Sequence, residues 1–201
     1  MSALDRIAQQ YREAFRRHGD SPAAVLWPKG RQDLRFAALT RFVQGSGFSV
    51  LDFGCGLAHL LPYLQERFGD VRYTGVDIVP EFIAACRRKF PSAKFGTIDE
   101  VESTHDYVLV SGAFNILYHP DAAMHQQLVF ENLSALFRRA TRLLSVNFMS
   151  DHVDYKQEGA YHQAIEPLLA HLRSAVSPRF VLDHSYLPYE YTVTVFKDQR
   201  T

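Results

Sequence analysis

The apolar residues of this chain follow two patterns, stripes at helical spacing and short continuous runs typical of buried strands. The stripes predict helices over residues 2–18, 31–44, 58–68 and 80–90, a long helix through 133–140, and a helix over 161–172. The runs predict strands over residues 50–53, 73–76, 94–98, 106–110, 143–148, 179–186 and 190–197. Because helices and strands mostly alternate from residue 50 onward, the pattern indicates an α/β fold with a largely parallel sheet.

The two ends of the chain depart from this alternation. Only Leu187-Pro188-Tyr189 separates the last two predicted strands, and so short a link requires them to run antiparallel to each other. At the other end, two helices precede the first strand, and we expect residues 1–47 to form a helical lid on a core of residues 48–201. The length of 201 residues, 47% of them hydrophobic, suits one core and predicts a single domain over residues 1–201.

Charge and targeting features narrow the set of partners. Lysine plus arginine and aspartate plus glutamate balance at 22 each, so no overall positive field attracts nucleic acid or an anionic membrane. No apolar run approaches a membrane span, and the N-terminus reads as an amphipathic helix rather than a signal peptide. We therefore expect a cytoplasmic protein, a monomer or homodimer, with no nucleic-acid or membrane partner. The two cysteines, Cys55 and Cys86, lack disulfide or metal-site spacing and are predicted to be buried.

A strand, a glycine turn and a helix follow one another over Ser49–Leu61. The turn Gly54-Cys55-Gly56 lets the backbone approach a ligand closely, and Asp52 stands just before it. The next strand ends at Asp77, about 20 residues further on, which is the distance at which a βαβ unit returns a carboxylate to a bound ribose. These spacings predict a nucleoside site.

The segments Asp52-Phe-Gly-Cys-Gly and Gly75-Val-Asp77-Ile resemble motifs I and II of the class I S-adenosylmethionine-dependent methyltransferases. A dinucleotide-binding domain is the competing interpretation, but its fingerprint requires a small residue where this chain has His59. One departure from the family is Ala58, which replaces the third glycine of the motif. The resemblance implies a doubly wound, mostly parallel seven-stranded Rossmann-like sheet with an antiparallel last strand, helices on both faces and an N-terminal helical lid.

The resemblance also implies S-adenosylmethionine as cofactor, S-adenosylhomocysteine as product, and a set of residues that bind them. In the family an acid after the third strand contacts adenine, for which Asp99 is the candidate, with a simple loop acid as the alternative. Arg35 resembles an arginine used near the cofactor carboxylate, although a solvated helix arginine remains the alternative. The small residues Ser111 and Gly112, at the end of the fourth strand, lie where open α/β sheets bind ligands. The full set of cofactor candidates is Asp52, Gly54, Cys55, Gly56, Asp77, Ile78, Asp99, Glu100, Ser111, Gly112 and Arg35.

Residues for the methyl acceptor are expected on the loops after the fourth and fifth strands and on the lid. The patterns Ser-Gly-x-Phe-Asn and Asn-Phe-x-Ser-x-x-x-Asp-Tyr resemble a bacterial subgroup of small-molecule methyltransferases. Acceptor-binding candidates are Tyr11, Trp27, Phe114, Asn115 and Tyr161. If the acceptor must lose a proton, the candidate catalytic groups are His119, the favoured base, and His152 and Tyr155, although each histidine can equally be a plain loop residue.

Other chemistries fit the sequence less well. None of the nine histidines stands in His-x-x-x-His spacing, so we predict no metal site, and no Gly-x-Ser-x-Gly elbow predicts a serine hydrolase. The sequence therefore favours methyl transfer to a small-molecule acceptor, on oxygen or nitrogen. Two alternatives stay open: a nucleic-acid or protein methyltransferase, and a non-catalytic domain that only binds S-adenosylmethionine.

Overall fold

One mixed sheet runs through the centre of the protein. The computed structural model describes residues 3–26, 31–117 and 119–197. Its strands are β1 (Phe48–Phe53), β2 (Val71–Val76), β3 (Lys94–Gly96), β4 (His105–Val110), β5 (Ala140–Ser150), β6 (His162–Gln163), β7 (Phe180–Leu187) and β8 (Glu190–Phe196). Seven of them follow the order β3-β2-β1-β4-β5-β8-β7, and β6 pairs separately with β5. Strand β8 runs antiparallel to both neighbours, which confirms the predicted reversed last strand.

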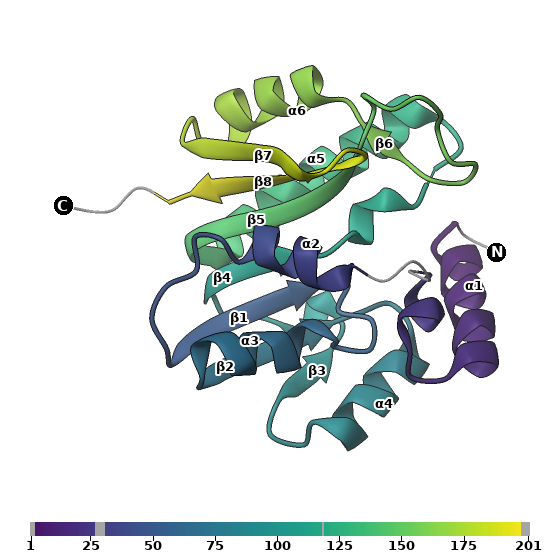
Figure 1. Ribbon diagram of the computed structural model, residues 1–201, viewed down its shortest axis with the longest axis vertical. Helices are drawn as coiled ribbons and strands as arrows, with labels where there is room; N and C mark the ends of the chain where they lie inside the picture. The colour runs from purple at the N-terminus through teal and green to yellow at the C-terminus, as the bar shows by residue number, and fades with distance from the viewer. Residues whose placement is uncertain (1–2, 27–30, 118, 198–201) are drawn as a thin grey trace.

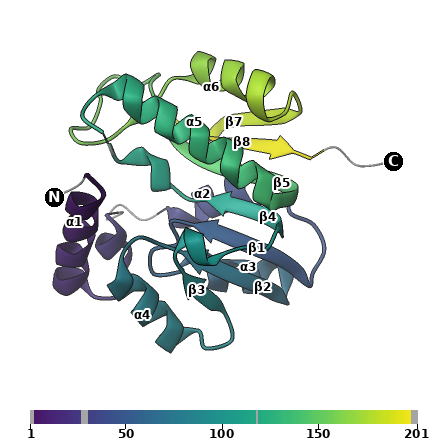
Figure 2. The same ribbon diagram turned by 180° about the vertical axis from the view of Figure 1, so that it is seen from behind.

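Helices cover both faces of the sheet (Figures 1 and 2). The α-helices are α1 (Ala3–His18), α2 (Gln32–Leu39), α3 (Leu60–Phe68), α4 (Pro80–Lys89), α5 (Ala122–Arg139) and α6 (Ile165–His171). Short 3-10 turns are η1 (Pro22–Val25), η2 (Ile98–Glu100) and η3 (Ala113–Asn115), and η4 (Leu172–Val176) is a π-helical turn that extends α6. Figure 1 shows α2 and α3 in front of the sheet, and α5 comes to the front when the view is reversed in Figure 2.

The residues of β4 show how the strands build two cores. Tyr107 and Leu109 point into a cluster with α2, α3 and α4, whereas Val108 and Val110 point into a cluster with α5 and α6. Alternate residues of a strand face opposite sides of the sheet, so a strand covered on both faces is apolar at most of its positions. This explains the continuous apolar run in the sequence.

Several predicted elements have different ends in the structure, and for three of them the cause is local. The helix expected over 31–44 stops at Leu39, where the Thr40 hydroxyl donates to the Phe36 carbonyl at 2.7 Å and competes with the helical hydrogen bonds. Helical spacing with Ala38 and Phe42 predicts an inward Leu34, but this residue is 44% exposed, because Arg35 and Phe36 occupy the buried side of α2.

The other two differences concern β3 and the segment before α6. Strand β3 ends at Gly96, two residues early, because Thr97 caps the η2 turn. The helix expected from Tyr161 begins only at Ile165, because the residues before it form β6 beside the end of β5. A two-residue strand carries too little periodicity to be predicted from sequence.

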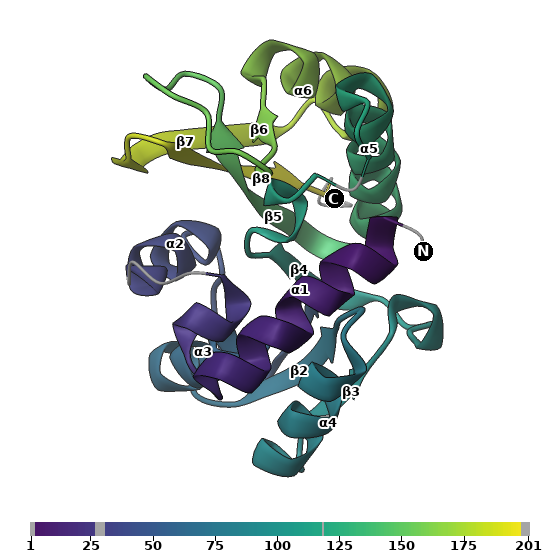
Figure 3. The ribbon, with the colours of Figure 1, turned by 90° about the vertical axis from the view of Figure 1, so that its right-hand side faces the viewer.

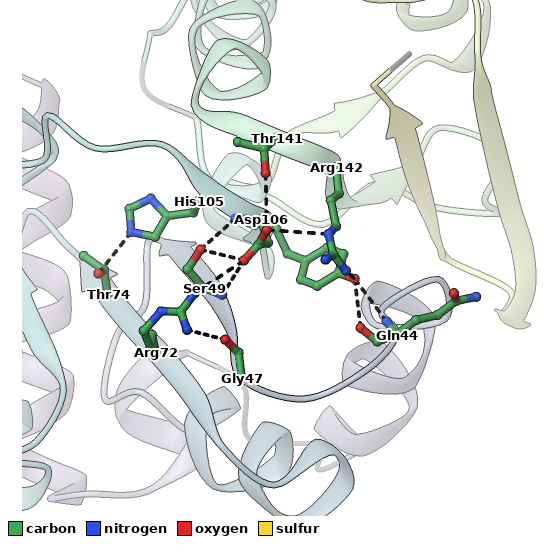
Figure 4. A network of polar contacts seen from close by, with 10 residues as sticks. Gln44, Gly47, Ser49, Arg72, Thr74, His105, Asp106, Thr141 and Arg142 are labelled. Atoms are coloured by element: carbon green, nitrogen blue, oxygen red, sulfur yellow. Dashed lines mark hydrogen bonds and ion pairs between the residues drawn. The ribbon is translucent and has the colours of Figure 1, made fainter. Parts of the chain in front are cut away.

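A polar cluster ties β1, β4 and β5 together near the amino ends of β1 and β4 (Figure 4). The backbone N–H and the hydroxyl of Ser49 both donate to Oδ2 of Asp106, at 2.8 and 3.0 Å. Thr141 donates to the other carboxylate oxygen, and Arg72 and Arg142 lie within ion-pair distance of Asp106. Both oxygens of the Asp106 carboxylate thus have donors, and the group stabilises the sheet at the edge opposite to the candidate site.

Candidate functional site

The carboxyl ends of β1, β2 and β4 meet at one edge of the sheet, and a cavity of about 1530 Å³ opens there. Figure 3 looks onto this edge, with α1 lying across it. The cavity is lined by the glycine turn after β1, by the acid that follows β2, and by the small pair after β4. The structure thus brings together nearly all the predicted cofactor residues: Asp52, Gly54, Cys55, Gly56, Asp77, Ile78, Asp99, Ser111, Gly112 and Arg35.

The glycine turn passes close to the loop after β4. Gly54 has a φ of +73°, and a Cβ on this residue would lie only 2.5 Å from the Cβ of Ala113. The N–H groups of Gly54 and Cys55 donate to the Val76 carbonyl, at 2.9 and 3.0 Å. Both the backbone angle and the contact therefore require glycine at this position.

Cys55 lines the cavity, and its surroundings disfavour the thiolate form. The neighbouring Cys86 thiol and burial raise the pKa of Cys55 well above its usual value, so the thiol stays protonated. Its sulfur also packs against Gly75, where a Cβ would lie 2.9 Å away. Cys55 and Cys86 are both buried and both free, as predicted.

Ala58 adopts the left-handed conformation with a φ of +54° and is fully buried. The backbone at this position thus keeps the angle that the missing third glycine would favour. A left-handed alanine costs about 1–2 kcal/mol, so the motif retains its shape at some expense of stability.

Asp77 closes the turn from the side of β2. Its Oδ2 accepts a hydrogen bond from the Gly56 N–H at 2.8 Å, and its Oδ1 accepts one from the Val79 N–H at 2.9 Å. A carboxylate oxygen has two lone pairs, so each oxygen retains capacity for a ligand hydroxyl. Burial raises the pKa of Asp77 despite these two hydrogen bonds.

Asp52 lies deeper, at the end of β1, and is 1% exposed. Its Oδ2 accepts a hydrogen bond from the Tyr73 hydroxyl at 2.5 Å, whereas Oδ1 has no hydrogen-bond partner among the described residues. Burial raises the pKa of Asp52 to about 7, helped by the nearby charge of Asp77 and opposed by the Tyr73 hydrogen bond. A buried oxygen that lacks a partner costs stability, and a cationic donor in the cavity would supply that partner.

Arg35 is buried rather than solvated, because it forms an ion pair with Glu190 at the start of β8. The Arg35 Nε and Nη2 donate to the two carboxylate oxygens at 3.0 and 2.5 Å, and the two side chains are 6% and 0% exposed. Asn147 on β5 donates to the same carboxylate at 2.9 Å. The Arg35 guanidinium also lies against Gly112, where a Cβ would come within 2.9 Å of Nη1.

Sequence reasoning did not single out Glu190 as a site residue. The available signal was an acid that opens an otherwise apolar strand, since a buried carboxylate requires a cationic or hydrogen-bonding partner. Glu190 lines the cavity and thereby connects α2 to the carboxyl edge of the sheet.

The acceptor candidates separate into those at the cavity and those away from it. Tyr11, Phe114 and Asn115 line the cavity, and Asn115 is held by the Met149 N–H, which donates to its Oδ1 at 2.9 Å. Tyr161 does not line the cavity, because its ring packs on His125 and its hydroxyl donates to Gln163. Trp27 lies outside the described residues.

The catalytic candidates separate in the same way. His152 and Tyr155 line the cavity, with the His152 side chain 59% exposed. His119 does not line it, and its Nδ1 accepts a hydrogen bond from the Asp121 N–H at 3.1 Å, next to the start of α5. Among the cofactor candidates, Glu100 also lies away from the cavity, because its carboxylate accepts a hydrogen bond from the Thr97 N–H.

Neither a metal cluster nor a membrane span is found in the described part of the chain. No three of its histidine, cysteine, aspartate and glutamate side chains are grouped so as to hold a metal ion. No helix within residues 3–26, 31–117 and 119–197 is long and apolar enough to cross a membrane.

Comparisons with known proteins agree with the fold and with the motif. A family model described as a methyltransferase domain matches residues 50–147. Rv1506c of Mycobacterium tuberculosis, which is named a methyltransferase, is 29% identical over 158 residues, covering 75% of this chain and 93% of that protein.

Solved structures extend the similarity over nearly the whole chain. Magnesium protoporphyrin IX methyltransferase from Synechocystis, with bound S-adenosylhomocysteine, superposes with a TM-score of 0.71 at 16% identity, covering 98% of this chain and 100% of that one. The plantazolicin methyltransferase BamL gives a TM-score of 0.65 at 13% identity, with coverages of 98% and 96%. The chain is a class I S-adenosylmethionine-dependent methyltransferase. Its methyl donor is S-adenosylmethionine.

Proposed function

We propose that this enzyme transfers the methyl group to a small-molecule acceptor bound in the same cavity as the cofactor. The observation that carries the proposal is the charge of the cavity wall. Six carboxylates line it, whereas Arg35 is the single lysine or arginine among its described lining residues, and Arg35 is ion-paired. The six acids are Asp52, Asp77, Asp99, Asp154, Glu158 and Glu190. A nucleic-acid substrate requires a basic surface, so such a wall opposes it.

The volume of the cavity supports the same proposal. Pockets that take one drug-sized ligand measure about 300–1,000 Å³. At about 1530 Å³ this cavity exceeds that range, which leaves room for an acceptor beside the cofactor. Structural relatives include the magnesium protoporphyrin IX and plantazolicin methyltransferases and the pyocyanin biosynthetic protein PhzM, whose names refer to small compounds.

The residues at the edge of the sheet fit S-adenosylmethionine. We assign Asp77 to the ribose hydroxyls, because each of its oxygens retains a lone pair beside the turn. The unpartnered Oδ1 of Asp52 suits the ammonium group of the methionine part. Asp99 and Ile78 are assigned to the adenine side, and Ser111 and Gly112 to the end where the methyl group lies. The described part of residues 1–47 acts as a lid, since α1 and α2 contribute to the cavity wall.

Bound S-adenosylmethionine supplies an already activated methyl group. The remaining task of the protein is to hold the acceptor atom about 3–3.5 Å from that group in a site without water. Where the acceptor must lose a proton, His152 is the better placed histidine, because it lines the cavity and His119 does not. Asp151 Oδ1 lies 3.8 Å from Nε2 of His152.

The experiment that tests this function uses the full chain, methyl-labelled S-adenosylmethionine and a cell extract separated into small-molecule, protein and nucleic-acid fractions. We expect label to enter the small-molecule fraction. The matched control is Asp77→Ala, which should lower labelling roughly ten- to a hundredfold at limiting cofactor. Label that enters only protein or nucleic acid would contradict the proposal in favour of the alternative acceptors.

A further inference from the structure

The exposed apolar side chains of this protein gather at the cavity. The described chain has eight large hydrophobic residues classed as exposed, and five of them line this one cavity. Isolated exposed hydrophobic residues are ordinary, but several that line one cavity indicate a surface for a ligand. Ile78 belongs to the adenine side, which leaves four residues that we call the apolar rim: Leu4, Leu26, Leu128 and Tyr155.

The apolar rim is built from four separate segments. Leu4 lies on α1, Leu26 follows η1, Leu128 lies on α5 and Tyr155 stands on the loop after β5. In Figure 3, α1 and α5 border the same edge of the sheet. The four residues of the apolar rim, in chain order, are 50%, 44%, 37% and 71% exposed. Packing within any one helix does not account for apolar groups that four distant segments expose toward one opening.

The polar groups deeper on the acceptor side are already engaged with one another. Asn115 is hydrogen-bonded to Met149 and Asn147. Glu190 accepts hydrogen bonds from Arg35 and Asn147. His162 lies between the Ser150 carbonyl and the Gln157 N–H, at 2.7 and 3.2 Å. The exposed acids Asp154 and Glu158 add negative charge at the mouth of the cavity.

From this arrangement we infer that the acceptor is an apolar compound, with an extended aromatic or alkyl body and no anionic group. The inference rests on the proposed function, because it concerns the acceptor part of the same cavity. The apolar rim contacts the body of the acceptor, and the carboxylates of the wall repel anionic competitors. Specificity for charge thus comes from the wall and affinity comes from the rim.

The test measures binding of the neutral fluorescent probe N-phenyl-1-naphthylamine to the full chain saturated with S-adenosylhomocysteine. We expect saturable binding, and weaker binding of the anionic relative 1-anilinonaphthalene-8-sulfonate. Leu128→Gln and Leu4→Gln remove rim contacts from two different helices, and each should raise the Kd of the neutral probe roughly three- to tenfold.

The matched control is Met124→Gln. Met124 lies one turn before Leu128 on α5, is 48% exposed and does not line the cavity. Its replacement should change the Kd by less than about twofold. Circular dichroism melting of all three variants checks that each is folded.

Three results would overturn the inference: no saturable binding of the neutral probe, tighter binding of the anionic probe, or equal effects of the Leu128 and Met124 substitutions. Calorimetry with S-adenosylhomocysteine alone tests the proposed function separately. Loss of cofactor binding would contradict the cofactor site whatever the probe does. Normal cofactor binding without probe binding would contradict only the apolar acceptor.

Discussion

The protonation state of Asp52 should control the affinity for S-adenosylmethionine just below neutral pH. Burial raises the pKa of this carboxyl to about 7, and its Oδ1 has no partner among the described residues. The ionised form binds the ammonium group of the cofactor, whereas the protonated form does not. Affinity should therefore rise with pH as Asp52 loses its proton.

The magnitude follows from the fraction of Asp52 that is ionised in the free enzyme. With a pKa of about 7, roughly 3% is ionised at pH 5.5 and about half at pH 7, so affinity should increase roughly fifteenfold between these values. The range ends at pH 7 because an α-amino group itself loses its proton at about 7.7–8.0.

The assay is calorimetric titration of the full chain with S-adenosylmethionine at several pH values between 5.5 and 7. Asp52→Asn keeps the size of the side chain and removes its titration, so this variant should bind weakly and with little dependence on pH. Asp77→Asn is the matched control, because burial also raises the pKa of Asp77. It should weaken binding and retain a slope, moved to somewhat lower pH because the charge of Asp77 helps to raise the pKa of Asp52.

Two results would refute this reasoning: a flat affinity in the wild type, or a slope that persists in Asp52→Asn. The stability of the ligand-free protein gives an independent check. A native pKa of about 7, against the ordinary value of 3.8, means that the folded state binds the proton more tightly. Stability should therefore fall as pH rises from 4 to 7, by up to about 4 kcal/mol in the limit, and the fall should be smaller in Asp52→Asn.

Three further predictions concern single substitutions. Asp77→Ala should weaken cofactor binding roughly ten- to a hundredfold by calorimetry, because the ribose loses its acceptor; unchanged affinity would contradict the assignment. Ala58→Gly should change the free energy of unfolding in urea by less than about 1 kcal/mol, because relief of the left-handed strain is offset by the loss of a buried methyl group and by a freer unfolded chain. A loss of stability above about 2 kcal/mol would show that the alanine is not strained. If a base is used, His152→Ala should lower turnover about a hundredfold and remove the acid limb of the pH profile of turnover, whereas His119→Ala should stay within a few-fold of wild type. A larger loss in His119→Ala than in His152→Ala would restore His119 as the base.

The sequence predicted the fold and the cofactor edge because both depend on local patterns. A continuous apolar run marks 107–110, a stretch of strand that is covered on both faces, and all seven main strands were predicted from the sequence. The positions of Asp52, Gly54 and Asp77 follow from the strand-turn-helix geometry, which allows little variation in spacing. Where a short local geometry determines the position of a residue, that position can be predicted from a single sequence.

The acceptor side could not be predicted equally well, because it is formed by contacts between distant segments. Arg35 and Glu190 are 155 residues apart, and their pairing turns α2 so that Arg35 faces inward and Leu34 faces solvent. His119 and His152 look alike in sequence, and only the tertiary structure places one at the cavity and the other beside α5. No periodicity in the sequence carries this information.

The two edges of the sheet differ in how their carboxylates are satisfied. At the amino edge, Asp106 receives hydrogen bonds from Ser49 and Thr141 and stabilises the ligand-free fold. At the carboxyl edge, Asp52 is more deeply buried and one of its oxygens lacks a partner among the described residues. An unsatisfied buried polar group costs about 1–3 kcal/mol, and a ligand that supplies the missing donor returns that free energy when it binds. Cofactor binding and the stability of the carboxyl edge are therefore linked through Asp52.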